Sequence, residues 1–132
     1  MSKSFADQLS ENLGKTQTPG FRQAYEALRK IAVGIRDALS KGQAGKLEVD
    51  LKPGYVTNMG QQFQLRLSIQ ARKWEETLLR AYIPVDGFPV KLDLGEEKPV
   101  PCADIAELEQ AALDFLKKPE IDSRLTIVRE FL

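Results

Sequence analysis

The sequence contains no histidine and a single cysteine among its 132 residues. Without histidine, catalytic triads and dyads with an imidazole base are excluded, as are zinc sites with histidine ligands. One cysteine cannot form an intrachain disulfide or supply a multi-cysteine metal site. We therefore expect no cofactor, and a non-catalytic protein is the favoured class.

The sequence also lacks an excess of either charge, because 19 Lys and Arg residues balance 19 Asp and Glu residues. Zero net charge argues against a strongly basic nucleic-acid-binding protein and against a disordered polyelectrolyte. No apolar run reaches the roughly 18 residues that a membrane span needs. Asp7 and Glu11 lie where a signal peptide would need apolar residues. These features predict a cytoplasmic protein without a membrane partner.

The N-terminal third of the chain has apolar residues every three or four positions, as on one side of a helix. Phe5, Leu9 and Leu13 predict a first helix, and Pro19 and Gly20 predict a break after it. We expect residues 1–19 to form this helix and a linker outside a single domain of residues 20–132. Whether residues 1–19 are ordered is left open by the sequence.

A longer helix is predicted from Phe21 to about Lys41. Its apolar stripe has a spacing of three and four residues and consists of Ala24, Leu28, Ile31, Ile35 and Leu39. A stripe of this kind is typical of a surface helix that buries one side against a core.

Between residues 46 and 94 the apolar period changes to two, which is typical of strands with one buried and one exposed face. Short connections between these segments favour an antiparallel meander. Residues 95–101 contain two prolines and predict a linker. Four strands are predicted, over residues 47–51, 63–71, 77–83 and 90–94.

Helical spacing returns after residue 101, and Pro119 is predicted at the first turn of the last helix. A strand over residues 125–128 is the competing prediction for this last segment. The whole pattern predicts an α+β fold, in the order α-α-β-β-β-β-α-α. It is a two-layer sandwich in which a four-stranded antiparallel meander sheet carries the N-terminal and C-terminal helices on one face.

Cys102 immediately precedes the helix that is predicted from about Asp104. A helix N-terminus lowers the pKa of a thiol, which would favour a reactive thiolate. Because no histidine is present to act as its base, we favour the alternative, a half-buried structural residue at a helix start.

Several carboxylates flank the first and fourth predicted strands, and a cluster of them would suit a cation or acid–base site. They would meet only if these two strands were neighbours. In a meander the two strands are opposite edges, where charged side chains discourage unwanted pairing. The carboxylates are Glu48, Asp50, Asp93, Glu96 and Glu97.

The segment of Arg72, Lys73 and Trp74 lies where the second predicted strand turns into the third. A tryptophan beside basic side chains can anchor a protein interface or stack on a nucleic-acid base. The alternative is that Trp74 folds back over the end of the core.

The predicted partner-binding surface has three parts. They are the hairpin tip at Trp74, the open face of the sheet and a long loop over residues 52–61. The leading hypothesis is a non-catalytic protein-interaction module that recognises another protein or a second copy of itself. The alternatives are a nucleic-acid-binding protein with a local Arg/Lys/Trp patch, and a small carboxylate- or metal-dependent enzyme. The predicted partner-binding residues are Tyr55, Arg66, Arg72, Lys73, Trp74, Arg80 and Tyr82.

Overall fold

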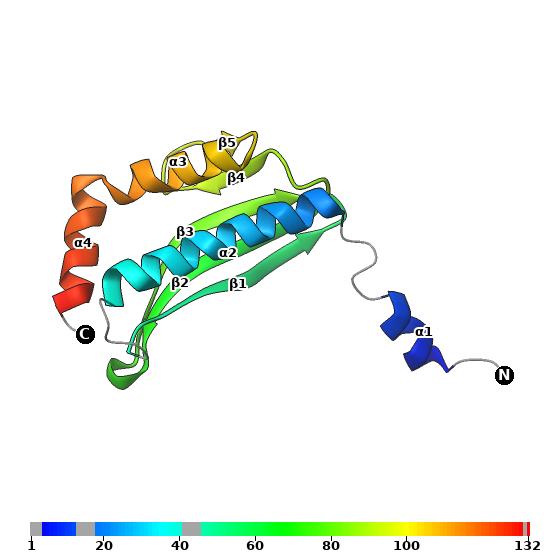
Figure 1. Cartoon of the computed structure of the whole chain (residues 1–132), viewed down its shortest axis with the longest axis horizontal. Coiled ribbons are helices and arrows are strands. Elements are labelled where there is room, and N and C mark those ends of the chain that lie inside the picture. Colours follow the sequence, from blue (N-terminus) through cyan, green and yellow to red (C-terminus); the bar gives the residue numbers. More distant parts are fainter. Residues whose placement is uncertain (1–3, 13–17, 41–45, 131) are drawn as a thin grey trace.

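The computed structural model describes residues 4–12, 18–40, 46–130 and 132. It contains an antiparallel sheet, with two helices before the strands in the chain and two helices after them (Figure 1). The predicted α+β class is therefore confirmed. In chain order the elements are α1 (Phe5–Asn12), α2 (Pro19–Ser40), β1 (Glu48–Thr57), β2 (Gly60–Ile69), the 3-10 turn η1 (Gln70–Arg72), β3 (Trp74–Pro84), β4 (Val90–Asp93), β5 (Val100–Cys102), α3 (Ile105–Leu116) and α4 (Pro119–Glu130).

The sheet is an antiparallel meander with the strand order β1-β2-β3-β4-β5. It has five strands, so the prediction of four was wrong. The additional strand, β5, overlaps the end of residues 95–101, which were predicted as a linker because of their prolines. Pro101 pairs with Lys91 in this strand. An edge strand tolerates proline because one side of its backbone has no neighbour that needs a donor.

Helix α2 begins at Pro19, so the prediction that Pro19 and Gly20 lie in a break was wrong. Proline suits the first position of a helix, where its missing N–H would have no partner in any case. Thr18 caps this end, because its hydroxyl Oγ1 accepts a hydrogen bond from the backbone N–H of Phe21 at 3.0 Å. Lys41, where the helix was predicted to end, lies outside the described residues.

A glycine at the start of α2 permits close packing against the turn between β3 and β4. A Cβ atom at Gly20 would lie 2.1 Å from the backbone oxygen of Asp86. The turn is held further by the Thr18 hydroxyl, which donates to the backbone oxygen of Val85 at 2.8 Å. Gly20 therefore lets α2 approach the sheet at this end.

Helices α2, α3 and α4 share one hydrophobic core with one face of the sheet. Leu28 of α2, Leu65 of β2 and Leu108 of α3 are each at most 1% exposed. Full burial of a side chain of this size stabilises a fold by about 1.5–3 kcal/mol. In the described ranges, no helix is long and apolar enough to cross a bilayer.

The C-terminal segment forms two helices, so the competing prediction of a strand over residues 125–128 was wrong. Helix α3 starts at a side-chain cap: Asp104 Oδ1 accepts from the backbone N–H of Glu107 at 2.8 Å. Pro119 is the first residue of α4, as predicted from its tolerance for that position. Val128 is buried on the side of α4 that faces the core.

Helix α1 lies apart from these layers, beyond the N-terminal end of α2 (Figure 1). A helix was predicted here from Phe5 and Leu9, and the structure confirms it. Phe5 and Leu9 are not part of the core, because they are 81% and 49% exposed. Leu13, the third residue of the predicted stripe, lies outside the described residues.

Candidate protein-interaction site

A β-bulge in β3 decides which way its first residues point. Leu65 of β2 is paired with Leu79, but the next residue, Arg66, is paired with Thr77. Leu78 is therefore an extra residue in the ladder, and the inside–outside alternation of β3 changes phase there. Both Leu78 and Leu79 are buried as a result.

The bulge turns Trp74 and Glu76 toward the helical layer. Trp74 is paired with Ile69, and Glu76 with Leu67, both of which face the core. The predicted partner surface is thus divided between the two faces of the sheet. Tyr55, Arg66, Arg80 and Tyr82 lie on or beside the open face, whereas Trp74 lies on the helical face.

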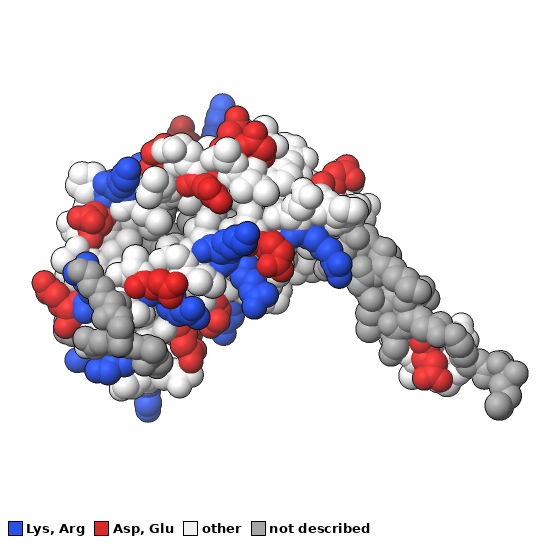
Figure 2. Space-filling view, in the orientation of Figure 1, with Lys and Arg blue, Asp and Glu red and all other residues white. Residues whose placement is uncertain are grey.

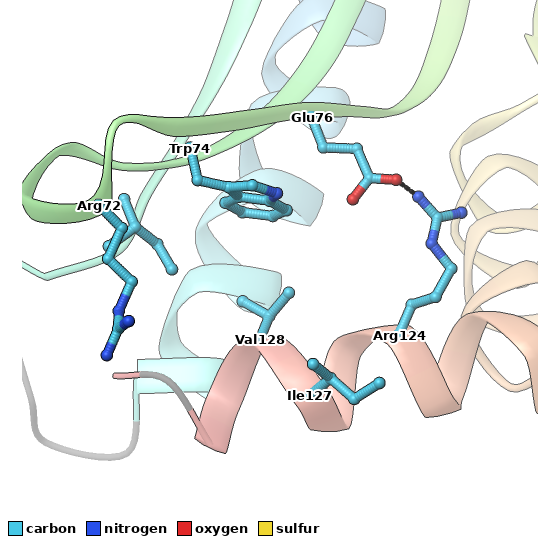
Figure 3. A pocket seen from close by; sticks show the side chains of 7 residues that line it. Arg72, Trp74, Glu76, Arg124, Ile127 and Val128 are labelled. Carbon is cyan, nitrogen blue, oxygen red and sulfur yellow. Dashed lines mark ion pairs between the residues drawn. The ribbon is translucent and has the colours of Figure 1, made fainter.

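Trp74 forms one wall of a cavity of about 410 Å³ between the start of β3 and helix α4 (Figure 3). We call this cavity the Trp74 pocket. Arg72 comes from the turn between β2 and β3, and three further residues come from α4. The lining residues are Ile69, Arg72, Trp74, Glu76, Arg124, Ile127 and Val128.

The Trp74 pocket combines apolar walls with charged groups at its edges. In Figure 3 the indole of Trp74 lies over Val128, and Ile127 lies on α4 next to Val128, farther from the indole. Ile127 is 53% exposed, so an apolar surface reaches the solvent beside the opening. Arg124 forms an ion pair with Glu76, which connects α4 to β3 across one end of the pocket.

The turn before Trp74 is tight. Lys73 has a φ of 52°, in the left-handed region, and its backbone N–H donates to the backbone oxygen of Gln70 at 3.0 Å. Arg72 and Lys73 are exposed there, as predicted for a hairpin tip. Trp74 itself is half-buried, so it partly covers the end of the core while one side lines the pocket.

On the open sheet face, basic side chains lie beside acidic ones. Arg66 Nη2 forms an ion pair with Glu75 Oε1 at 2.7 Å, and Arg80 is the neighbour of Asp93 across the β3–β4 ladder. On the helix-covered side, positive and negative side chains are also interspersed (Figure 2). The arginines of the predicted patch therefore do not lie in a surface of one sign.

A shallow hollow of about 360 Å³ lies on the open face near the β1–β2 hairpin. The rings of Tyr55 and Tyr82 are 6.3 Å apart at its edge. The hydroxyl groups of Tyr82 and Thr57 are hydrogen-bonded at 3.1 Å. The hollow also contains Arg80, Lys91 and several acidic residues, and its lining residues are Tyr55, Gln62, Arg80, Ala81, Tyr82, Lys91, Asp93, Glu96, Glu97 and Pro99.

Cys102 ends β5 and is fully buried, not half-buried as predicted. Burial raises the pKa of its thiol, and the negative charges of Glu107 and Asp104 raise it further. The nearby N-terminus of α3 does not reverse this effect. The structure therefore contradicts a reactive thiolate at Cys102.

The predicted carboxylates form two separate groups, because β2 and β3 lie between β1, which carries Glu48 and Asp50, and β4, where Asp93 lines a hollow with Glu96 and Glu97. Glu48 accepts a hydrogen bond from Gln70 at 3.3 Å, and Glu96 forms an ion pair with Lys118. That pair raises the pKa of Lys118. Within the part of the chain that the structure describes, no three Asp, Glu or Cys side chains are grouped so that they could hold a metal ion.

The α4 residues of the Trp74 pocket have no direct signal in the sequence. Val128 belongs to the apolar stripe that the sequence predicts for the last helix, whereas Ile127 lies outside it; the stripe consists of Ile121, Leu125, Val128 and Leu132. An apolar residue beside a regular stripe is a weak sign of a second contact surface. Connecting it with Trp74 would also have required the bulge at Leu78, which the alternating pattern does not reveal.

Comparisons with known proteins give no further information on this site. No protein-family model matches the chain, and neither a characterised protein nor a solved structure is significantly similar to it. The function is therefore argued from the geometry alone.

Proposed function

We propose that this protein is a non-catalytic protein-interaction module that holds an apolar side chain of a partner protein in the Trp74 pocket. The observation that carries the proposal is the half-buried indole that walls an apolar cavity beside the exposed Ile127. Tryptophan and arginine are enriched among the residues that dominate binding energy at protein interfaces. An apolar centre with a charged rim is also the usual composition of such interfaces.

The rim of the pocket supports a protein partner over a nucleic acid. Arg124 is already paired with Glu76, and on the opposite face Arg66 is paired with Glu75. Strong nucleic-acid binding needs several basic groups that neutralise phosphates together. The apolar walls of the pocket cannot pair with the phosphates of a nucleic acid, whereas they can bury an aliphatic or aromatic side chain of a protein.

Capture from the native cell lysate, followed by mass spectrometry, tests the proposal. We expect the wild-type chain to capture a protein that Trp74→Ala and Ile127→Ser fail to capture. Ile127→Ser keeps the proposal testable if Trp74→Ala unfolds the protein, because Ile127 is exposed and contributes little to the core. Tyr82→Ala on the open face is the matched control and should capture the protein as the wild type does.

Fluorescence provides a second measurement, because Trp74 is the only tryptophan in the sequence. Titration with the captured protein should shift the emission to shorter wavelengths, since the indole would lose contact with water. Equal capture by the wild type and both pocket variants, with no shift in emission, would contradict the proposal.

A further inference from the structure

Helix α1 presents an exposed apolar side. Phe5 is 81% exposed and Leu9 is 49% exposed. The two residues are four positions apart, so they lie on the same side of the helix. An isolated helix of this length is marginal in water, and most helical stability in proteins comes from packing of an apolar side. α1 therefore has the features of a helix that packs against another surface.

An open groove of about 630 Å³ lies between the N-terminal half of α2 and the edge strand β1. We call it the aromatic groove. Phe63 lies at its centre, with ring centroids 5.2 Å from Tyr25 and 6.3 Å from Phe21. The lining residues are Phe21, Arg22, Tyr25, Glu26, Leu51, Pro53, Gln61 and Phe63. Aromatic rings of this kind pack favourably against a further phenylalanine and an aliphatic side chain.

We propose that α1 of one copy of the protein docks into the aromatic groove of a second copy, in a reciprocal exchange that forms a two-fold dimer. Phe5 and Leu9 are the side chains that enter the groove. Figure 1 shows α1 beyond the end of α2, apart from the other helices and the sheet of its own chain. Reciprocal exchange closes the assembly at two chains, because each copy supplies one helix and one groove.

The net charges of α1 and α2 have opposite signs. Residues 4–12 include Asp7 and Glu11 and no basic residue. Helix α2 carries four basic residues and only two acidic ones. At the groove itself Arg22 and Glu26 both line the wall, so Arg22 is the one basic side chain there that a carboxylate of α1 can pair with. Complementary charges of this kind guide association and fix the orientation of two surfaces.

A second copy also accounts for the apolar surface beside the groove. Val56 and Met59, at the tip of the β1–β2 hairpin, are each 69% exposed. Two hydrogen bonds place the tip next to the start of α2. The backbone N–H of Val85 donates to the backbone oxygen of Met59, and the Thr18 hydroxyl donates to the backbone oxygen of Val85. A second copy whose helix α1 is docked in the groove would therefore lie beside this exposed apolar tip.

Sedimentation velocity over a range of protein concentrations tests the dimer. We expect the wild type to sediment as a dimer with a melting temperature that rises with protein concentration, and Phe5→Ser/Leu9→Ser as a folded monomer whose melting temperature does not depend on concentration. Val33→Ser is the matched control, because Val33 is an exposed apolar residue of α2 outside the groove. This control and Trp74→Ala should both remain dimeric. Because Trp74 belongs to the pocket of the proposed function and not to the aromatic groove, its variant tests the two proposals separately. A monomeric wild type, or a dimeric double variant, would overturn it.

Disulfide trapping between two different chains tests the exchange itself. In a Cys102→Ala background, chains with Leu9→Cys are mixed with chains that carry Pro53→Cys in the groove, and the mixture is oxidised. We expect a disulfide-linked heterodimer with Pro53→Cys and none with the control Ser123→Cys on α4. A Leu9→Cys/Pro53→Cys chain that closes only within itself would show docking in its own groove and would refute the exchange.

Discussion

At the scale of single residues, burial decides the chemistry of Cys102. A position before a helix suggests a lowered thiol pKa, but this side chain points from β5 into the core and is 0% exposed. Desolvation disfavours the thiolate and raises the pKa of the thiol, and Glu107 and Asp104 act in the same direction. The burial of Cys102, and with it the raised pKa of the thiol, could not be predicted from its position in the sequence, because β5 was not predicted.

The raised pKa of Cys102 predicts how stability depends on pH. In the unfolded chain the thiol loses its proton near the ordinary thiol pKa of 9.0, whereas the folded protein retains it to higher pH. The free energy of unfolding should therefore fall as the pH rises above about 9, with a slope that approaches 1.4 kcal/mol per pH unit.

Urea denaturation between pH 8 and pH 10.5 would measure this slope, with Cys102→Ala as the control. The variant lacks the thiol but keeps all other titrating groups, so its stability should fall less steeply than that of the wild type. Parallel curves for the two proteins would show that Cys102 does not titrate differently on unfolding.

At the scale of elements, two glycines with different surroundings give opposite predictions. Gly34 lies on the exposed side of α2, and no described atom lies within 4 Å of a Cβ placed there. Gly34→Ala should raise the free energy of unfolding by about 0.5–1 kcal/mol, because glycine inside a helix loses more backbone entropy than alanine.

Gly60→Ala serves as the contrasting variant in the same urea denaturation series. A Cβ at Gly60 would lie 2.4 Å from the backbone oxygen of Ile83 and 2.8 Å from Cα of Pro84. Backbone atoms in a strand cannot move aside easily, so Gly60→Ala should lower the stability. Equal effects of the two substitutions would contradict this description of the hairpin.

The elements also show how far the sequence could predict the fold. Alternation from Phe63 to Ile69 describes a strand with one buried face, and β2 has that burial pattern. The four-residue spacing of Phe5 and Leu9 likewise predicted α1. Period alone does not reveal β5, which has three residues, or the bulge at Leu78. Both depend on how consecutive strands pair, which the apolar period of one strand does not specify.

At the scale of the whole molecule, the meander predicts a gradient of local stability. β2 and β3 have a hydrogen-bonded neighbour on each side, whereas β5 is a short edge strand and α1 lies outside the core. Hydrogen exchange measured by mass spectrometry should be slowest in β2 and β3, slower in α2 than in β5, and fastest in α1. Exchange in β5 that is slower than in β2 would contradict this order.

The packing of the helical layer on one face of the sheet explains why the candidate site could be predicted only in part. Trp74 was singled out from its place beside Arg72 and Lys73, and it does line a cavity. Its neighbours from α4 follow only once the helical layer is placed on the sheet. Tyr55, Arg80 and Tyr82 also meet in one hollow, but on the other face. Predicted residues that are close in the sequence, such as Trp74 and Arg80, therefore lie on opposite faces of the sheet, whereas Tyr55 and Tyr82, which are far apart in the sequence, lie together on one face.

The extra residue in β3 has a consequence for how this chain can change over evolutionary time. Loss of the codon for Leu78 would restore uniform alternation along the strand and leave Trp74 and Glu76 on the helical face, because Leu65 would still pair with Leu79 and Arg66 with Thr77. Loss of Glu75 or Glu76 would instead shift Trp74 by one position, to the face of Arg80 and Tyr82. The cavity wall beneath α4 therefore tolerates loss of the bulge and does not tolerate loss of one of these two residues.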